Sequence, residues 1–280
     1  MSFKSLLIIL ISLLILLQIS FTKRLNYYTT NSGSTFNSVE EDYNYKNGGE
    51  DWDGLCKYNI TQSPININDE EAIEYKSYFF YVSDIEIHTA NINQTDSNQF
   101  NINGYFSRTF FINQAQNPYY YNMTSLHVHS PSEHKLNNRG FDLEIQFSGS
   151  YLNGKENTYN NHIISFFFNA TSGNYTNKFI DSLISIETNK TAQQSLDVSQ
   201  VLTEDLSNFK TYIYEGSLTT PPCTLSALWF IVTTPLQIGV DQLNYFKNKW
   251  ENNPDFANGR GNNRNIKNFT DKIYSNGGEY

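Results

Sequence analysis

Charged residues are scarce in this sequence: they make up 17% of 280 residues, and the formal net charge is -9 at pH 7. Because acidic side chains outnumber basic ones, the chain lacks the positive surface that nucleic acid requires, which excludes a nucleic-acid partner. Aromatic residues reach 15%, enough to build a sizeable core, which argues against a disordered chain. The length suits one large domain or two small ones.

Long apolar runs are also nearly absent. The one clear run, residues 6–17, follows Lys4, is interrupted only by Ser12 and precedes small and polar residues. It is shorter than the ~20 residues that a membrane-spanning helix needs. We therefore expect a cleaved signal peptide over residues 1–22 rather than an uncleaved anchor, and no stable membrane span after cleavage. Since residues 273–280 are largely polar, we expect no C-terminal glycolipid anchor.

Cysteine is limited to Cys56 and Cys223. An even count in a chain with a signal peptide is typical of a disulfide, and the alternative is two unpaired buried thiols. Potential glycosylation sequons begin at Asn59, Asn93, Asn122, Asn169, Asn174, Asn189 and Asn268. Together these features predict a secreted glycoprotein, located outside the cell or in the lumen of the secretory pathway.

The distribution of apolar residues predicts mostly strands. Residues 23–46 show no apolar periodicity and are predicted to form a flexible leader. Alternating apolar residues predict strands around 85–87, 126–128 and 141–147, and continuous apolar runs predict strands at 162–168 and 225–232, the former buried on both faces. Helices are predicted only at 177–185 and 241–250, the second with Asp241 as its N-cap. The pattern indicates a β-dominated domain with a few surface helices.

Histidine is limited to five residues, and three of them fall within eight positions. His127 and His129 flank Val128 on a predicted strand, so the period of two places both imidazoles on one face. Imidazole suits zinc, iron and copper, which makes the pair a candidate metal site. The alternative is that two polar residues lie on the solvated face of a sheet.

Four motifs, in this order, resemble the α-carbonic anhydrases. They are QSPI at 62–65, the HVH…SEH segment at 127–134, DLEIQ at 142–146 and GSLTTPPC at 216–223. The resemblance covers about residues 47–273. It implies one α/β domain with a large, twisted, mostly antiparallel central sheet and peripheral helices, which we place at 47–275, followed by a tail at 276–280.

The resemblance also implies a zinc site and its surroundings. In the family, zinc has three histidine ligands, of which two match His127 and His129, while the third position is Gln146. By the same resemblance, Glu144 lies behind the third ligand, Thr219 orients the attacking oxygen, and Glu133 is the hydrogen-bond partner of Thr219. Thr220 is expected in the pocket, and the apolar wall for CO2 is expected to consist of Ile163, Leu218 and Trp229. The resemblance also implies that Cys56 pairs with Cys223.

Two departures from the family pattern affect the expected activity. Gln146 can offer a neutral amide oxygen to Zn²⁺, but this is a weaker ligand than imidazole. No histidine occurs between Thr89 and Leu126, where fast family members carry a proton-relay histidine. We therefore expect a slow or impaired carbonic anhydrase that interconverts CO2 and bicarbonate. The alternative is a secreted, non-catalytic binding module of the same fold.

A metal motif of the cupins is the third alternative. The spacing of His127, His129, Glu133 and Gly140 fits the first cupin motif, but the second motif needs a downstream histidine. No histidine follows His162, which argues against this alternative. The sequence does not specify an oligomeric state.

Overall fold

The computed structural model describes residues 43–58, 61–75, 79–83, 88–90, 100–112, 118–152, 159–188, 194–202, 206 and 209–276. The predicted signal peptide and the predicted strand around 85–87 lie outside these residues. So do the sequons at Asn59, Asn93 and Asn189.

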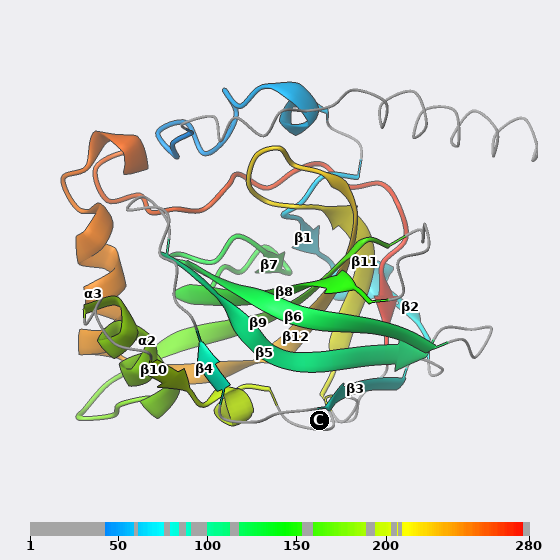
Figure 1. The fold of residues 1–280 in the computed structure, drawn as a ribbon. Helices are drawn as coiled ribbons and strands as arrows, with labels where there is room; N and C mark the ends of the chain where they lie inside the picture. The colour runs from blue at the N-terminus through cyan, green and yellow to red at the C-terminus, as the bar shows by residue number, and fades with distance from the viewer. Residues whose placement is uncertain are drawn as a thin grey trace, which may run out of the picture. The chain divides into compact units, whose positions relative to one another are not determined.

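A nine-stranded mixed sheet dominates the described residues (Figure 1). Its spatial order is β2 (Ile73–Glu74), β13 (Tyr274–Ser275), β11 (Thr211–Ser217), β12 (Leu225–Gly239), β9 (Asn161–Thr171), β8 (Leu143–Tyr151), β6 (Pro118–His129), β5 (Phe100–Ile112) and β3 (Phe79–Ser83). Neighbouring strands are antiparallel except for β12 with β9 and β13 with β2. The predicted fold class, a large and mostly antiparallel sheet with peripheral helices, is confirmed.

Smaller elements surround this sheet. Two short sheets pair β1 (Asn66–Ile67) with β7 (Lys135–Leu136) and β4 (His88–Ala90) with β10 (Gln194–Leu196). The 3-10 helices are η1 (Gly54–Lys57), η2 (Asp69–Glu71), η3 (Val198–Gln200) and η4 (Pro254–Phe256), and the α-helices of the described chain are α2 (Lys178–Thr188) and α3 (Val240–Trp250). No helix among the described residues has the length and apolar character to span a membrane.

Both helices begin near their predicted positions. The side chain of Asn177 accepts hydrogen bonds from the backbone N–H groups of Phe179 and Ile180, which caps α2. The predicted cap of α3 is wrong. Its N-cap is Gly239, whose N–H donates to the side chain of Gln242. Asp241 lies in the first turn instead, where a carboxylate favours the positive end of the helix dipole.

Alternation along the central strands separates the core from the polar face of the sheet. On β9, Ile164, Phe166 and Phe168 belong to the larger buried core, which also contains the apolar faces of α2 and α3. On β8, Ile145 and Phe147 face this same core, whereas Glu144 and Gln146 face the other way. Strand β9 is buried along Ile163–Phe168, as the sequence predicts. The helices therefore cover one face, and the polar side chains gather on the other.

Aromatic side chains pack just before residue 47, the predicted N-terminal border of the domain. Tyr45 is buried, and its ring packs against Trp52 and stacks on Phe256. Tyr45, near the end of the predicted leader, therefore packs against the domain. A disulfide joins Cys56 to Cys223, as predicted, and ties this N-terminal segment to the loop that follows β11.

The buried His162 should make the fold acid-sensitive. Its ring packs between Tyr121 and Phe230, and burial lowers the pKa of the imidazole to about 3. Between pH 6 and 4 the unfolded chain therefore binds a proton at this residue that the folded chain does not. We expect the free energy of unfolding to fall by roughly 1.4 kcal/mol per pH unit across this range through His162.

Urea unfolding at pH 7, 6, 5 and 4 measures this effect. The control is His162→Gln, which keeps a polar side chain that can contact Thr109 Oγ1 but does not titrate. The variant should show a pH slope that is shallower by about the same amount. Equal slopes for both proteins would show that His162 is not the group responsible.

Candidate metal and substrate site

The register between β6 and β8 builds the centre of the site. His127 lies directly opposite Gln146, and His129 lies directly opposite Glu144. Side chains that are directly opposite in an antiparallel pair share one face of the sheet and lie close together. The sheet therefore brings His127, His129 and Gln146 together on the face that α2 and α3 leave uncovered.

The ring of His129 is held in one orientation. Its Nδ1 lies 2.8 Å from the backbone oxygen of Asn262, which can only accept, so Nδ1 carries the proton. The other nitrogen, Nε2, is buried and has no hydrogen-bond partner among the described residues. The side chain of Asn262 also bonds to the backbone of Val128 and Ser130, which fixes the end of β6. His129 thus presents an unpartnered lone pair, the arrangement that a histidine ligand requires.

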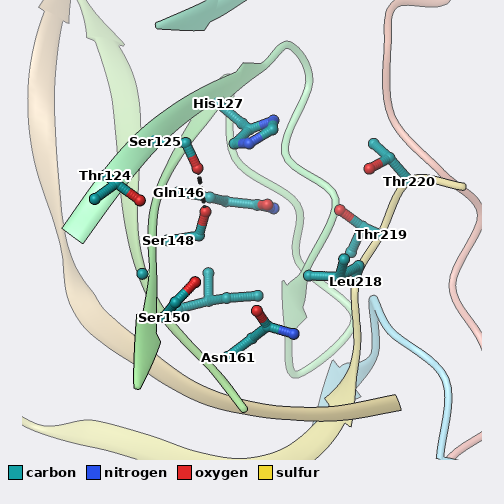
Figure 2. Close-up of a pocket in the computed structure, with 12 residues that line it drawn as sticks. Thr124, Ser125, His127, Gln146, Ser148, Ser150, Asn161, Leu218, Thr219 and Thr220 are labelled. Atoms are coloured by element: carbon teal, nitrogen blue, oxygen red, sulfur yellow. Dashed lines mark hydrogen bonds between the residues drawn. The ribbon is translucent and has the colours of Figure 1, made fainter. Parts of the chain in front are cut away.

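The amide of Gln146 is oriented by two carboxylates. Its Nε2 donates to Glu133 at 2.9 Å and to Glu144 at 3.0 Å. Since ionised carboxylates only accept, the NH2 group must face them, and the amide oxygen must point away. Figure 2 shows the Gln146 side chain extending past His127 toward Thr219. Within the described chain, the amide oxygen accepts no hydrogen bond, so it is free to contact a bound group.

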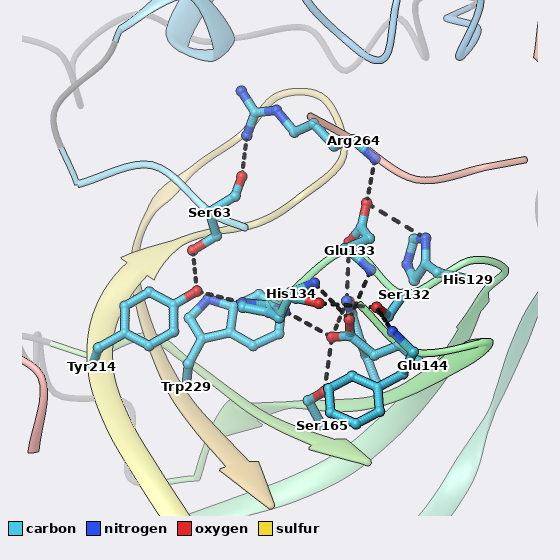
Figure 3. Close-up of polar contacts among 12 residues, drawn as sticks. Ser63, His129, Ser132, Glu133, His134, Glu144, Ser165, Tyr214, Trp229 and Arg264 are labelled. Atoms are coloured by element: carbon cyan, nitrogen blue, oxygen red, sulfur yellow. Dashed lines mark hydrogen bonds and ion pairs between the residues drawn. The ribbon is translucent and has the colours of Figure 1, made fainter. Parts of the chain in front are cut away.

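Glu144 is the hub of the buried polar network (Figure 3). It accepts hydrogen bonds from the backbone N–H groups of Glu133 and His134, from His134 Nδ1, from Gln146 and from Ser165. Burial alone would raise the pKa of this carboxyl, but the charge and hydrogen bonds of His134 outweigh burial and lower the pKa to about 2. Glu144 therefore stays ionised at neutral pH and can hold the donors around it.

Glu133 has partners that the sequence did not predict. One oxygen accepts from the backbone N–H of Arg264 at 2.9 Å, and the other accepts from Gln146. No hydrogen bond joins Glu133 to the hydroxyl of Thr219 in the described part of the chain, although the resemblance implies one. One amide N–H of Gln146 instead occupies an acceptor position of this carboxylate.

A cavity of about 220 Å³ adjoins these groups. Its lining residues are Thr124, Ser125, His127, Gln146, Ser148, Gly149, Ser150, Asn161, Ile163, Leu218, Thr219 and Thr220. Burial, assisted by the nearby His129, lowers the pKa of His127 to about 4, so its imidazole is neutral at neutral pH. A neutral imidazole can act as a metal ligand or a hydrogen-bond acceptor.

The predicted pocket residues are not all placed in the cavity wall. Ile163, Leu218, Thr219 and Thr220 line it, whereas Trp229 is buried behind it. The indole N–H of Trp229 donates to the backbone oxygen of Ser217, and its ring lies 4.6 Å from the ring of His134. Trp229 therefore supports the network around His134 and does not contact the cavity.

Sequence reasoning missed several lining residues, and strand period would have found two of them. Ser125 lies two positions before His127, and Ser148 lies two positions after Gln146, so both share the face of the site. Their hydroxyls are hydrogen-bonded to each other at 2.5 Å. Asn262 and Arg264 carried no such signal, since they reach the site from a loop far along the chain.

The possible metal ligands at the centre of the site do not form the usual set of three His, Cys, Asp or Glu side chains. No group of three or more His, Cys, Asp or Glu side chains in the described ranges is arranged to hold a metal ion. Two imidazoles and one amide oxygen remain, and the unpartnered Nε2 of His129 and the oriented oxygen of Gln146 are both available. By donor chemistry, such a set would offer Zn²⁺ two good ligands and one weak ligand.

Comparisons with known proteins agree on one family. The family model described as eukaryotic-type carbonic anhydrase matches residues 47–275. Dioscorin DB3L from Dioscorea polystachya is 29% identical over 206 residues, which cover 69% of this chain and 72% of that protein. Alpha carbonic anhydrase 2 from Arabidopsis thaliana is 31% identical over 113 residues, which cover 40% of this chain and 44% of that protein.

Solved structures show the same fold. The α-carbonic anhydrase of Thermovibrio ammonificans, in complex with the inhibitor sulfanilamide, superposes with a TM-score of 0.64 at 22% sequence identity. The match covers 83% of this chain and 98% of that one. At this identity the likeness establishes the fold.

Proposed function

Since this chain belongs to the eukaryotic-type carbonic anhydrase family, we propose that it is a slow, zinc-dependent carbonic anhydrase that interconverts CO2 and bicarbonate. Its ligands for zinc are the imidazoles of His127 and His129 and the amide oxygen of Gln146. The observation that carries the proposal is the fixed amide of Gln146, whose NH2 group is held by Glu133 and Glu144 so that its oxygen is left for a metal.

Zinc, when bound, would supply a Lewis acid that makes a water molecule nucleophilic near neutral pH. The protein residues hold and orient the reactants. His129 is fixed by Asn262, and Glu144 holds Gln146 from behind. Ile163 and Leu218 give the cavity an apolar side that accepts an uncharged gas. The hydroxyl of Thr219 lines the same cavity and can orient the attacking oxygen.

Three features make the proposed enzyme slow. An amide oxygen is a weaker zinc ligand than imidazole, and Thr219 lacks the hydrogen bond to Glu133 that would fix its hydroxyl. In addition, the chain has no histidine between Thr89 and Leu126 to carry protons to solvent. His88 lies on β4, which pairs with β10 outside the central sheet.

A non-catalytic, secreted binding module is the second candidate. Two observations favour it: the described residues contain no conventional three-residue metal group, and polar side chains line much of the cavity. A module of this kind would keep the fold and the cavity but bind a ligand without reaction. Zinc content separates the two candidates.

The test is a measurement of zinc in the purified full-length secreted protein, beside stopped-flow CO2 hydration. We expect about one zinc per chain after dialysis against micromolar zinc, and hydration above the uncatalysed rate that disappears on chelation. His129→Ala should abolish both, while Asn244→Ala on the exposed face of α3 should change neither. A protein that stays free of zinc and inactive would support the binding module instead.

We also propose that the chain is secreted and glycosylated. The disulfide between Cys56 and Cys223 supports an oxidising compartment. Of the described sequons, Asn174 and Asn268 are exposed in loops, whereas Asn122 and Asn169 are partly buried in strands β6 and β9. An oligosaccharide needs an exposed acceptor, so Asn174 and Asn268 are the proposed sites.

A further inference from the structure

One wall of the cavity is made of uncharged polar side chains. We name Thr124, Ser125, Ser148, Ser150 and Asn161 the hydroxyl wall, after its four hydroxyl groups. These residues come from the adjacent strands β6, β8 and β9 and line the cavity beside His127 and Gln146 (Figure 2).

Among the residues that the structure describes, the cavity lining carries no Asp, Glu, Lys or Arg. A charged ligand would therefore lose its hydration there without gaining an ion pair, which is costly. A neutral ligand meets no such penalty. The lining thus selects for uncharged molecules.

Several groups of the wall have unused hydrogen-bonding capacity. The side chains of Thr124, Ser150 and Asn161 form no hydrogen bond within the described part of the protein, whereas Ser125 and Ser148 bond to each other. Hydroxyls and amides can both donate and accept. A ligand with several hydroxyl groups can satisfy such a set, because each of its hydroxyls also donates and accepts.

The spacing and size of the wall fit a small ring-shaped or branched polyol. Ser150 and Asn161 are directly paired across β8 and β9, and Ser148 lies two residues from Ser150 on the same face. The volume of about 220 Å³ is smaller than that of cavities for drug-sized ligands and favours a ligand of roughly one sugar ring. Ile163 and Leu218 provide an apolar surface for the carbon skeleton.

From these observations we infer that the cavity binds a small, neutral, polyhydroxylated molecule of about monosaccharide size through the hydroxyl wall. This binding needs the hydroxyls and amides of the wall and does not need a metal. It goes beyond the proposed function and stands or falls separately from it. If the chain is also an enzyme, such a ligand occupies the space in front of His127 and Gln146 and competes with CO2.

Isothermal titration of the full-length secreted protein with glucose, myo-inositol, xylitol and glycerol tests the inference. The titrations contain EDTA, so that bound metal plays no part. We expect saturable binding of at least one of the larger polyols, and no binding of cyclohexanol, which has the ring size but a single hydroxyl. Failure of all four polyols to bind, or equal binding of cyclohexanol, would overturn the inference.

Variants of the wall locate the binding. Asn161→Leu removes two donors and an acceptor, and Ser150→Ala removes an exposed hydroxyl with little risk to folding. Each should weaken polyol binding by about tenfold, the effect of losing about one good hydrogen bond. Asn244→Leu, the same change as Asn161→Leu but on the exposed face of α3, is the matched control and should bind as the wild type does. Unchanged binding in both wall variants would contradict the inference.

Discussion

Replacing Gln146 with histidine should raise the affinity for zinc by at least roughly 10- to 100-fold. Even changes to residues behind the ligands cost this much in known sites, and this substitution exchanges a ligand itself. The weak amide oxygen becomes an imidazole nitrogen, which completes a three-histidine site. Zinc affinity can be measured by competition with a chromophoric chelator, and activity by stopped-flow CO2 hydration.

The same substitution should also increase the CO2 hydration rate through Glu133. Gln146 now donates to both Glu133 and Glu144 through one NH2 group. A histidine that binds metal through one nitrogen has a single N–H left, which Glu144 can accept. Glu133 then loses its contact with residue 146, which leaves that carboxylate oxygen to accept a hydrogen bond from the hydroxyl of Thr219 and to orient it.

The control is the double variant His127→Ala with Gln146→His. It contains the new histidine but lacks one of the original pair, so it should lose the gains in affinity and rate. If the single variant remains free of metal and inactive, the hypothesis of an impaired enzyme fails. The site would then be a remnant of the fold, and the binding-module alternative would gain.

Replacing Glu144 with alanine should lower the free energy of unfolding by about 3–5 kcal/mol. Removing one member of a buried charged network leaves the others uncompensated, and this range is typical of that change. Five donors lose their acceptor at once, including the imidazole of His134. His134 would remain buried with only Tyr214 at its other nitrogen. Urea unfolding at pH 7 measures the loss.

Two further variants interpret the result. Glu70→Ala removes an exposed carboxylate on η2 and should change stability by less than about 0.5 kcal/mol. Glu144→Gln keeps one acceptor oxygen but turns an NH2 group toward other donors, so we expect a loss between those of the other two variants. A loss below about 1 kcal/mol in Glu144→Ala would show that the network contributes little to stability.

Strand patterns in the sequence predicted the centre of the site because strand geometry is local. The period of two along β6 and β8 is enough to place His127 and His129 on one face and to separate Glu144 and Gln146 from the apolar core. The same reasoning predicted the buried strand at His162–Phe168. The capping rule failed where two nearby residues could serve as the N-cap. Gly239, and not Asp241, is the N-cap of α3.

The partners of these residues could not be read from local patterns. Asn262 holds His129 from 133 positions away, and Arg264 bonds to Glu133 across 131 positions. No periodicity links such distant loops to the strands. The hydrogen bond from Gln146 to Glu133 could not be predicted either, because it depends on the direction in which the amide group of Gln146 turns.

By itself, the sequence determined the class of fold, the disulfide pair and the identities of the side chains at the centre of the site. The β-dominated class and the shared face of the two histidines follow from strand period, whereas the disulfide pair and the other site residues follow from the resemblance of four motifs to a known family. Only the tertiary structure decided the orientation of Gln146, the isolation of Thr219 from Glu133 and the polar wall of the cavity. The direction of a hydrogen bond depends on which groups meet in space. At this site, the packing of three or more segments that are distant in the sequence brings those groups together.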